Sequence, residues 1–531
     1  MGANQSTCIN CGYRQPNISY PSIEYIKSYT AEIDQTTKML ITASLCGTAL
    51  AVYYLKEQYD YRVQKVPPGP TSIPFIGNVL SIDHKSPHLT MIQLAKKYGD
   101  IFSLKVGSQR VVILNNAQLI REAYRGTHIS HRPDFFSMQY LVGEKGFLTC
   151  KDEQKWQLHT AVCKQAIRVM NSSNLWEKIH KEAMELVAII DERNAHPFDP
   201  QFDLYIASLN IICNLVFGER YHHKDPELTE ILDYSEEIIK VISPVHPVNA
   251  FPWLRHFPNK WFNALFRAKT KRDRILTKKY IEHVANFNGD NVTDMLYALL
   301  ATTKEAVDSN NAAALDVLTP EHVITNMWLI FFAGTDTMAN TLQWSLLYMA
   351  VFQKKQSKLQ DELDNTLGQD GRVSIENKRK LPYLQAVVWE ILRYCSLSVL
   401  GVPHAAAIDT YVNGYFIPKG TQVMANFWAI HHNDKYWDQP HEFMPERFLT
   451  PEGQLRGLSD FPFFMPFSTG QRRCMGQTIA QAELLVILGT LLQKFTFELP
   501  EDVEADLEGE AMFSLIPKPY KVIARRRVIR K

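Results

Sequence analysis

The sequence predicts a mainly α-helical protein with a small β-sheet region, arranged as one large domain behind an N-terminal membrane anchor. Three observations predict this fold class. Long stretches of the 531-residue chain carry apolar residues at helical spacing, strand-like segments are few and short, and one uncharged apolar segment lies near the N-terminus. No internal repeat and no Gly/Ser-rich linker after residue 80 divides the remainder into separate domains.

Three segments are predicted before the domain at 81–531. They are an extension (1–38), a transmembrane helix (39–55) and a charged, proline-rich hinge (56–80). Residues 39–55 contain no charged residue. Their 17 residues make about 25 Å of helix, close to the thickness of the endoplasmic-reticulum membrane. We therefore expect a membrane anchor, although a buried core helix could have this pattern.

The extension carries two signals that exclude each other if residues 39–55 span a membrane. Gly2, in Met-Gly-Ala-Asn-Gln-Ser, fits the pattern for N-myristoylation, whereas Asn17-Ile18-Ser19 is a glycosylation sequon that requires a lumenal N-terminus. Lys and Arg are similarly frequent on both sides of the apolar segment, so charge does not decide the orientation. Both topologies stay open.

The domain is predicted to contain several long helices and two short β regions. A hairpin is expected first, followed by amphipathic helices, a long apolar helix, a second β region and a final helix. The corresponding segments are 101–106 with 111–114, 175–190, 226–242, 323–351, 411–423, and a helix that follows Cys474 and runs to about Lys494.

Composition narrows the class of function. The formal net charge is +1, so nucleic acid is not expected as a partner. The eight cysteines are scattered, which indicates reduced thiols rather than a disulfide scaffold. No flavin or dinucleotide fingerprint is present, so electrons for any redox reaction must come from another protein.

The strongest chemical signal is the segment that starts at Phe467 and leads through Cys474 into the last helix. A cysteine at a helix start is favoured as a thiolate, and glycines at 470 and 476 let the backbone turn and approach a flat ligand closely. Arg472 places a fixed cation two residues before the sulfur, suited to a carboxylate of that ligand. A thiolate facing a large planar anion indicates haem.

The pattern Phe467-x-x-Gly470-x-Arg472-x-Cys474-x-Gly476 resembles the haem signature of the cytochrome P-450 family. The resemblance extends from Pro67 to about Arg525 and is closest to the microsomal steroid 17α-hydroxylase/lyase group. It implies haem b with Cys474 as the axial thiolate ligand. Phe467, Gly470 and Gly476 then belong to the haem-binding loop.

The long apolar helix contains Ala333-Gly334-Thr335-Asp336-Thr337, where a glycine and an acid are both costly. A polar kink in a core helix would explain them structurally. The resemblance implies instead that Gly334 opens the helix for oxygen and that Asp336 and Thr337 deliver protons during catalysis.

Four further residues are implied to face the haem propionates: Arg472, His404, Arg132 and Trp156. One position departs from the family, which usually has an arginine four residues after this tryptophan. Here the residue is Thr160, and we expect either compensation by His159 or Lys164 or a less tightly held propionate.

The resemblance also implies a buried network of Glu390, Arg393 and Arg447 that braces the haem pocket without taking part in catalysis. By spacing alone, Glu390 and Arg393 would be an ordinary surface pair on one helix face. Arg472 and Arg473 are expected to contribute to a basic patch that docks an electron donor.

These features together predict a haem-thiolate monooxygenase that hydroxylates a lipophilic substrate with dioxygen, with a steroid as the favoured substrate class. Expected partners are an NADPH–haemoprotein reductase, cytochrome b5 as a further candidate donor, and membrane lipid. The expected location is the endoplasmic-reticulum membrane, with the domain facing the cytosol. Alternatives are a monooxygenase for xenobiotics, arenes or fatty acids, a reductase-independent peroxide isomerase, and a non-catalytic haem- or lipid-binding protein.

Overall fold

The computed structural model describes residues 35–527 except 108, 173–174, 243–245, 258, 290–291 and 369–370. The myristoylation pattern at Gly2 and the sequon at Asn17 therefore lie outside the described residues. The chain forms two compact units, Met1–Val63 and Gln64–Lys531. The second unit, called the body below, contains every described helix and strand except α2.

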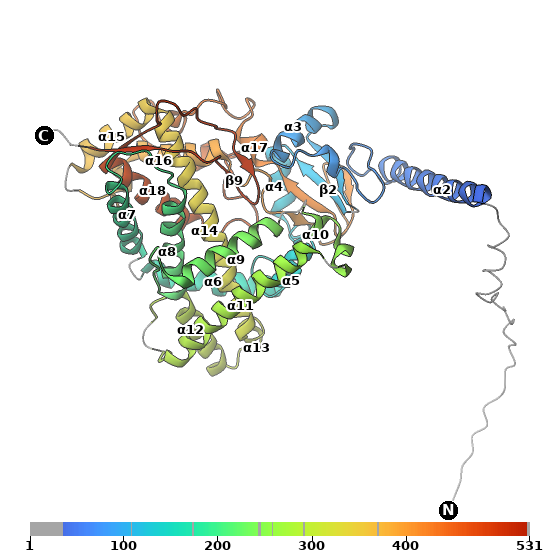
Figure 1. Cartoon of the computed structure of the whole chain (residues 1–531), viewed down its shortest axis with the longest axis horizontal. Coiled ribbons are helices and arrows are strands. Elements are labelled where there is room, and N and C mark those ends of the chain that lie inside the picture. Colours follow the sequence, from blue (N-terminus) through green and yellow to red (C-terminus); the bar gives the residue numbers. More distant parts are fainter. Residues whose placement is uncertain are drawn as a thin grey trace, which may run out of the picture. The chain divides into compact units, whose positions relative to one another are not determined.

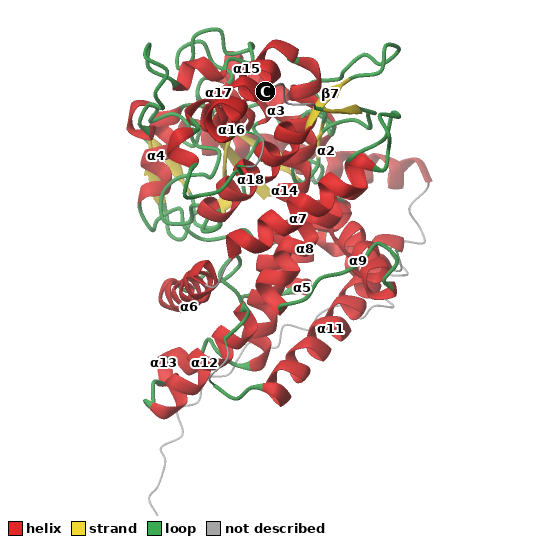
Figure 2. Cartoon of the chain, turned by 90° about the vertical axis from the view of Figure 1, so that its left-hand side faces the viewer, coloured by secondary structure: helices red, strands yellow, loops and turns green. Residues whose placement is uncertain are grey.

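Helices dominate the body, as predicted (Figures 1 and 2). The helices are α2 (Gln35–Arg62), α3 (Pro87–Tyr98), α4 (Ala117–Arg125), α5 (Phe136–Leu141), α6 (Glu153–Ser172), α7 (Leu175–Asp191), α8 (Gln201–Phe217), α9 (Pro226–Ile242), α10 (Pro247–Ala250), α11 (Lys260–Asn286), α12 (Met295–Asp308), α13 (Ala312–Leu315), α14 (Pro320–Val351), α15 (Gln353–Leu367), α16 (Pro382–Cys395), α17 (Phe427–His431) and α18 (Gln477–Lys494). Short 3₁₀ turns are η1 (Val79–Ser81), η2 (Pro252–His256), η3 (Lys378–Lys380), η4 (Pro445–Phe448) and η5 (Leu458–Asp460).

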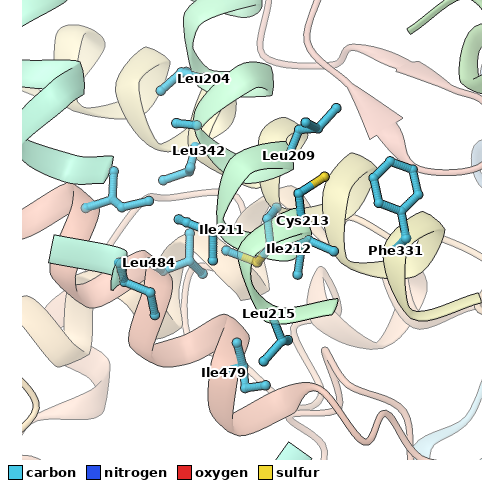
Figure 3. Close-up of a cluster of buried hydrophobic side chains, with 14 of the residues drawn as sticks. Leu204, Leu209, Ile211, Ile212, Cys213, Leu215, Phe331, Leu342, Ile479 and Leu484 are labelled. Atoms are coloured by element: carbon cyan, nitrogen blue, oxygen red, sulfur yellow. The ribbon is translucent and has the colours of Figure 1, made fainter. Parts of the chain in front are cut away.

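The core of the body is built around α14, which packs against α8, α16 and α18. The apolar helix α8 ends at Gly218, whose φ of 69° permits the left-handed conformation that terminates the helix. Figure 3 shows the aliphatic cluster in which side chains of α8 meet those of α14 and α18, including Ile211, Leu342 and Leu484. This packing holds the residues of α14 at a fixed place in the interior.

The sheets are small and antiparallel except at one pairing. The strands are β1 (Ile101–Val106), β2 (Gln109–Leu114), β3 (His404–Ala405), β4 (Thr410–Val412), β5 (Tyr415–Ile417), β6 (Gln422–Ala425), β7 (Phe495–Glu498), β8 (Glu510–Ala511), β9 (Leu515–Ile516) and β10 (Ile523–Arg526). The largest sheet has the order β1-β2-β6-β3, with β2 and β6 parallel, and the predicted hairpin forms its edge. The other pairs are β10-β7, β4-β5 and β8-β9.

Helix α2 contains the predicted transmembrane segment at 39–55, and the predicted hinge follows it. Among the described residues, α2 is the one helix long and apolar enough to cross a membrane, and it continues through Lys56 to Arg62. The prolines that follow run along β1, because Ser103 Oγ and Ser103 N donate hydrogen bonds to the carbonyls of Pro67 and Pro68 at 2.8 and 2.7 Å. The proline-rich part of the expected hinge therefore belongs to the body, because the edge of β1 supplies donors that a free linker would leave to water.

Candidate active site

A tight loop carries Cys474 to the start of α18. The backbone N–H of Cys474 donates to the carbonyl of Phe467 at 3.0 Å, which closes the loop. Gly470 has a φ of 76°, and a Cβ at this position would lie 1.9 Å from the carbonyl oxygen of Tyr124 in α4. Only glycine fits there, since both its conformation and the close approach of a second backbone exclude a side chain.

Cys474 combines an exposed side chain with dense surroundings. Its side chain is exposed, yet the surrounding protein is dense enough that burial raises the pKa of the thiol, against the opposing effect of the backbone N–H groups of Gly476 and Gln477. A Cβ at Gly476 would lie 3.8 Å from the sulfur, in ordinary van der Waals contact with it. Helix α18 begins only at Gln477, so Cys474 precedes the helix rather than forming its first turn.

Two buried arginines lie beside this loop without a carboxylate. Arg472 donates to the carbonyls of Ser130, Phe147 and Cys150 at 2.9, 3.0 and 2.6 Å. Arg132 donates to those of Leu148, Val402 and Pro403 at 3.3, 3.1 and 2.8 Å. Within the described chain, neither guanidinium forms an ion pair with Asp or Glu.

Burial of these cations is costly. It lowers the pKa of Arg132 to about 10 and, together with the charge of Arg132, lowers the pKa of Arg472 to about 9. Two adjacent buried cations whose hydrogen bonds all go to backbone carbonyls are short of negative charge. The residues present therefore fit a ligand that brings carboxylates, as the two propionates of haem would.

Trp156 and His404, also predicted for this site, join the same cluster. The guanidinium of Arg472 lies 4.2 Å from the ring centroid of Trp156, a cation–π contact. His404 stacks on Tyr124 at 3.8 Å and its Nδ1 lies 2.7 Å from the carbonyl oxygen of Ile129. Burial, with the nearby arginines, lowers the pKa of His404 well below its usual value, so the ring is neutral.

The ring of His159 does not offset the departure from the family at Thr160. Thr160 Oγ1 is buried without a hydrogen-bond partner. His159 turns to α14, where its Nδ1 lies 3.0 Å from Asn326 Nδ2, and burial lowers its pKa to about 4. Lys164 is exposed. Compensation by the ring of His159 is therefore wrong, because a neutral imidazole facing α14 supplies no cation.

One expected surface residue is not at the surface. Arg472 is 9% exposed, and each of its three hydrogen-bonding nitrogens is engaged by a backbone carbonyl. It therefore cannot take part in a basic docking patch, whereas Arg473 is exposed. Adjacent residues of this loop point in opposite directions, which the sequence alone does not reveal.

Helix α14 is continuous through Gly334, so the expected opening of the helix at this residue is not seen. A Cβ at Gly334 would lie 2.5 Å from Cδ1 of Ile212, and the glycine instead allows α8 to pack closely. Thr337 is half-buried and donates its hydroxyl to the carbonyl of Ala333 at 2.6 Å. This is the i−4 bond that a threonine commonly makes within a helix.

Asp336 lies next to Thr337 in sequence but contacts the β8–β9 hairpin. Ser514 Oγ donates to Asp336 Oδ2 at 2.9 Å and accepts from Asn340 Nδ2 at 2.8 Å. Burial raises the pKa of Asp336, although these hydrogen bonds oppose the shift. Ser514 was not predicted, because it lies in the turn between β8 and β9, where no periodic pattern marks it.

The structure brings Glu390, Arg393 and Arg447 together in the interior. Arg393 Nε and Nη2 donate to the two carboxylate oxygens of Glu390, both at 2.8 Å, and both side chains are fully buried. Arg447 Nε lies 3.2 Å from Glu390. Arg393 also donates to the carbonyls of His431, Pro440 and Glu442 at 2.7, 2.8 and 3.1 Å.

Comparisons with known proteins cover nearly the whole chain. A family model for cytochrome P450 matches residues 67–524. Steroid 17-alpha-hydroxylase/17,20 lyase of Ictalurus punctatus is 35% identical over 487 residues, 90% of this chain and 94% of that enzyme. The enzyme of the same name from Rana dybowskii is 34% identical over 88% and 91%. Cytochrome P450 1A5 of Gallus gallus is 29% identical over 92% and 94%.

Proposed function

Since the chain belongs to the cytochrome P450 family of monooxygenases, we propose that it binds haem through Cys474 and hydroxylates a steroid with dioxygen and electrons from a reductase. The observation that supports haem binding most directly is the pair of buried arginines, Arg132 and Arg472, beside the Cys474 loop without a carboxylate. Haem held by a thiolate supplies the iron centre that activates dioxygen.

The residues of the cluster would act by charge and shape. Arg132 and Arg472 would pair with the propionates, with Trp156 holding the plane of the Arg472 guanidinium. Phe467, Gly470 and Gly476 would shape the loop so that the sulfur of Cys474 stays accessible. His404, neutral and fixed to Ile129, would offer its second ring nitrogen as a hydrogen-bonding group.

A carbon-monoxide difference spectrum of the reduced full-length chain tests haem ligation. We expect the band typical of thiolate-bound haem in the wild type and its loss in Cys474→Ser, because an alcohol is a poor replacement for a thiolate. Cys150→Ser serves as the control, since Cys150 is the other cysteine near Arg472. A wild type without porphyrin, or an unchanged band in Cys474→Ser, contradicts the proposal.

Proton delivery is proposed for Asp336 and Thr337. Burial raises the pKa of Asp336, so its carboxyl retains a proton to higher pH than an exposed aspartic acid does. The Thr337 hydroxyl lies one residue further along α14 in a half-buried position. This proton-holding acid and the neighbouring hydroxyl would together supply the protons that oxygen activation consumes.

The ratio of product formed to electrons consumed tests this role. Thr337→Ala is expected to lower the ratio, since oxygen reduced without correct proton delivery leaves as hydrogen peroxide. Thr335→Ala is a matched control, because Thr335 makes the same i−4 bond, to Phe331, and is 2% exposed. Equal ratios for wild type and Thr337→Ala refute the role.

The substrate class rests on the relatives, several of which are steroid 17-alpha-hydroxylases. The relatives also include cytochrome P450 1A5 and 1A1, which are not named as steroid hydroxylases, and we keep an arene oxidase as the second candidate. Titration of the purified protein with steroids and with polycyclic arenes separates them by the shift of the haem spectrum. Arene shifts without any steroid shift would make the steroid assignment wrong.

Electron supply and location complete the proposal. We propose that α2 anchors the chain in the endoplasmic-reticulum membrane with the body in the cytosol, where it meets an NADPH–haemoprotein reductase or cytochrome b5. Reconstitution in vesicles with NADPH, with and without reductase, tests the electron source. Reductase-independent turnover of a lipid hydroperoxide would favour a peroxide isomerase instead, and protection of the body from protease in intact microsomes would contradict the orientation.

A further inference from the structure

We propose that His431 is a positioning residue that links the Glu390–Arg393–Arg447 network to the backbone of the Cys474 loop by holding the amide of Met465. The inference rests on the proposed function, because its consequence is the geometry of the haem ligand. His431 is the last residue of α17 and is fully buried. It lies far from Cys474 in the sequence.

The imidazole of His431 bridges two segments through its two nitrogens. Its Nδ1 lies 2.8 Å from Ser396 Oγ, at the end of α16. Its Nε2 lies 3.1 Å from the backbone nitrogen of Met465, which can only donate. Its own carbonyl accepts from Arg393 at 2.7 Å, so the network holds the backbone of the same residue.

These partners determine one tautomer. Because the Met465 N–H donates to Nε2, this nitrogen carries no proton, and a neutral ring must then carry its proton on Nδ1. Nδ1 therefore donates to Ser396 Oγ, whose own proton goes to the carbonyl of Arg393 at 2.7 Å. Every donor in this chain meets an acceptor, which leaves no freedom for the ring to flip.

The charge state agrees with this assignment. Burial first, and then the positive charge of Arg393, lower the pKa of His431 to about 3. The ring is therefore neutral over the physiological range. A protonated ring would present a second N–H to the amide of Met465, and the bond to the loop would be lost.

The loop that follows Met465 needs external support, because its backbone is strained. Ser468, which carries a side chain, has a φ of 62° in the left-handed region, whereas the φ of 76° at Gly470 is one that glycine adopts without strain. Within the loop, Ser468 N donates to the carbonyl of Met465 at 3.1 Å, and Cys474 N donates to that of Phe467. The bond from Met465 to His431 therefore secures the first residue of the turn formed by residues 465–468. This turn overlaps the segment that the Cys474–Phe467 hydrogen bond closes at the sulfur. Strained backbone persists only where its surroundings hold it.

Two substitutions separate the two nitrogens of His431. In His431→Gln the amide oxygen reaches the position of Nε2 and can accept from Met465, whereas His431→Asn places its amide near Nδ1 and reaches only Ser396. His432→Asn is the control, since the neighbouring ring bonds to the carbonyl of Trp428 instead of the loop. All are made in the full-length haem protein in detergent.

The first measurement is hydrogen exchange of the peptide that contains Met465. We expect about fivefold faster exchange in His431→Asn, the factor that corresponds to one ordinary hydrogen bond, and near-normal exchange in His431→Gln and His432→Asn. The second is the carbon-monoxide spectrum. The fraction of haem without the thiolate-type band should rise in His431→Asn and be restored in His431→Gln.

Equal exchange and equal spectra in wild type and His431→Asn overturn the inference. So does a His431→Asn protein that loses thermal stability but keeps both the exchange rate of Met465 and the thiolate band, because His431 then supports only the fold. Should His431→Asn not fold, Ser396→Ala replaces it, since it removes the acceptor of Nδ1 and should shift both measurements the same way. A wild type that lacks the thiolate band refutes the proposed function, while hydrogen exchange still tests the bond.

Discussion

Replacing Arg393 with methionine tests the network that underlies the site. Methionine has a similar reach and no charge, so Arg393→Met removes the guanidinium with little loss of packing volume. The carboxylate of Glu390, fully buried, would keep only Arg447 as a charged partner. The backbone carbonyl oxygens of His431 and Pro440 would lose this donor, whereas that of Glu442 would keep Arg447 Nη2 at 3.2 Å.

The expected cost follows from burial. Removing one partner of a buried ion pair costs about 3–5 kcal/mol, because the remaining charge is left uncompensated. An unfolding entropy of about 2 cal/mol/K per residue gives about 1 kcal/mol/K for the body, Gln64–Lys531. The thermal midpoint of Arg393→Met should therefore fall by about 3–5 °C.

Thermal unfolding of the full-length chain, followed by tryptophan fluorescence, measures this midpoint. Arg372 is the matched control, because it also donates two hydrogen bonds to one glutamate, Glu177, at 2.9 and 2.6 Å, but both side chains are about half exposed. Water already solvates those charges, so Arg372→Met should leave the midpoint nearly unchanged. Equal midpoints for the two variants would refute the argument that burial gives the network its strength.

Three further predictions concern single positions. Gly470→Ala should lower the thermal midpoint far more than Gly453→Ala, because both have positive φ (76° and 81°) but only the former would place a Cβ against a backbone carbonyl of α4. Gly334→Ala should destabilise the body by about 1–3 kcal/mol through overpacking, and Ile212→Val should restore it in the double variant; a gain in stability would disprove the packing role. Burial raises the pKa of Glu483 well above 4.5, so the folded state favours its protonated form. The free energy of unfolding therefore falls as the pH rises above the ordinary pKa of a glutamic acid, because the unfolded state can then release the proton. Glu483→Gln should therefore gain thermal stability relative to wild type between about pH 5 and about pH 8, and a pH-independent difference would contradict this.

Helices were predictable where one face is buried along their full length. The periodicity from Pro226 to Ile242 coincides with α9, which buries one side against its neighbours. For α14 the predicted start at Val323 is three residues late, because Pro320 occupies the first turn and the polar residues after it interrupt the apolar pattern. The proline-rich segment looked like a free hinge, since the strand edge that receives it comes from elsewhere in the chain.

The candidate site was predictable as a set of residue types but not as a set of environments. The motif around Cys474 indicates which residues gather, yet it does not say that Arg472 points inward while Arg473 points outward. Gly334 shows the same limit. A glycine in an apolar helix can interrupt the helix or allow another helix to pack closely against it. Only the position of Ile212 in α8 shows that Gly334 has the second role.

His431 illustrates why some functional residues leave no readable signal in one sequence. Its proposed partner is the backbone N–H of Met465, and every residue except proline has such a group, so no side-chain pattern marks the pair. Its tautomer depends on Ser396, which passes its own proton to the carbonyl of Arg393. The geometry of the loop is thus held by a chain of bonds in which backbone and side-chain groups alternate. Such a chain becomes visible only when the fold brings α16, α17 and the Cys474 loop together, and it makes the position of the sulfur depend on residues that never touch it.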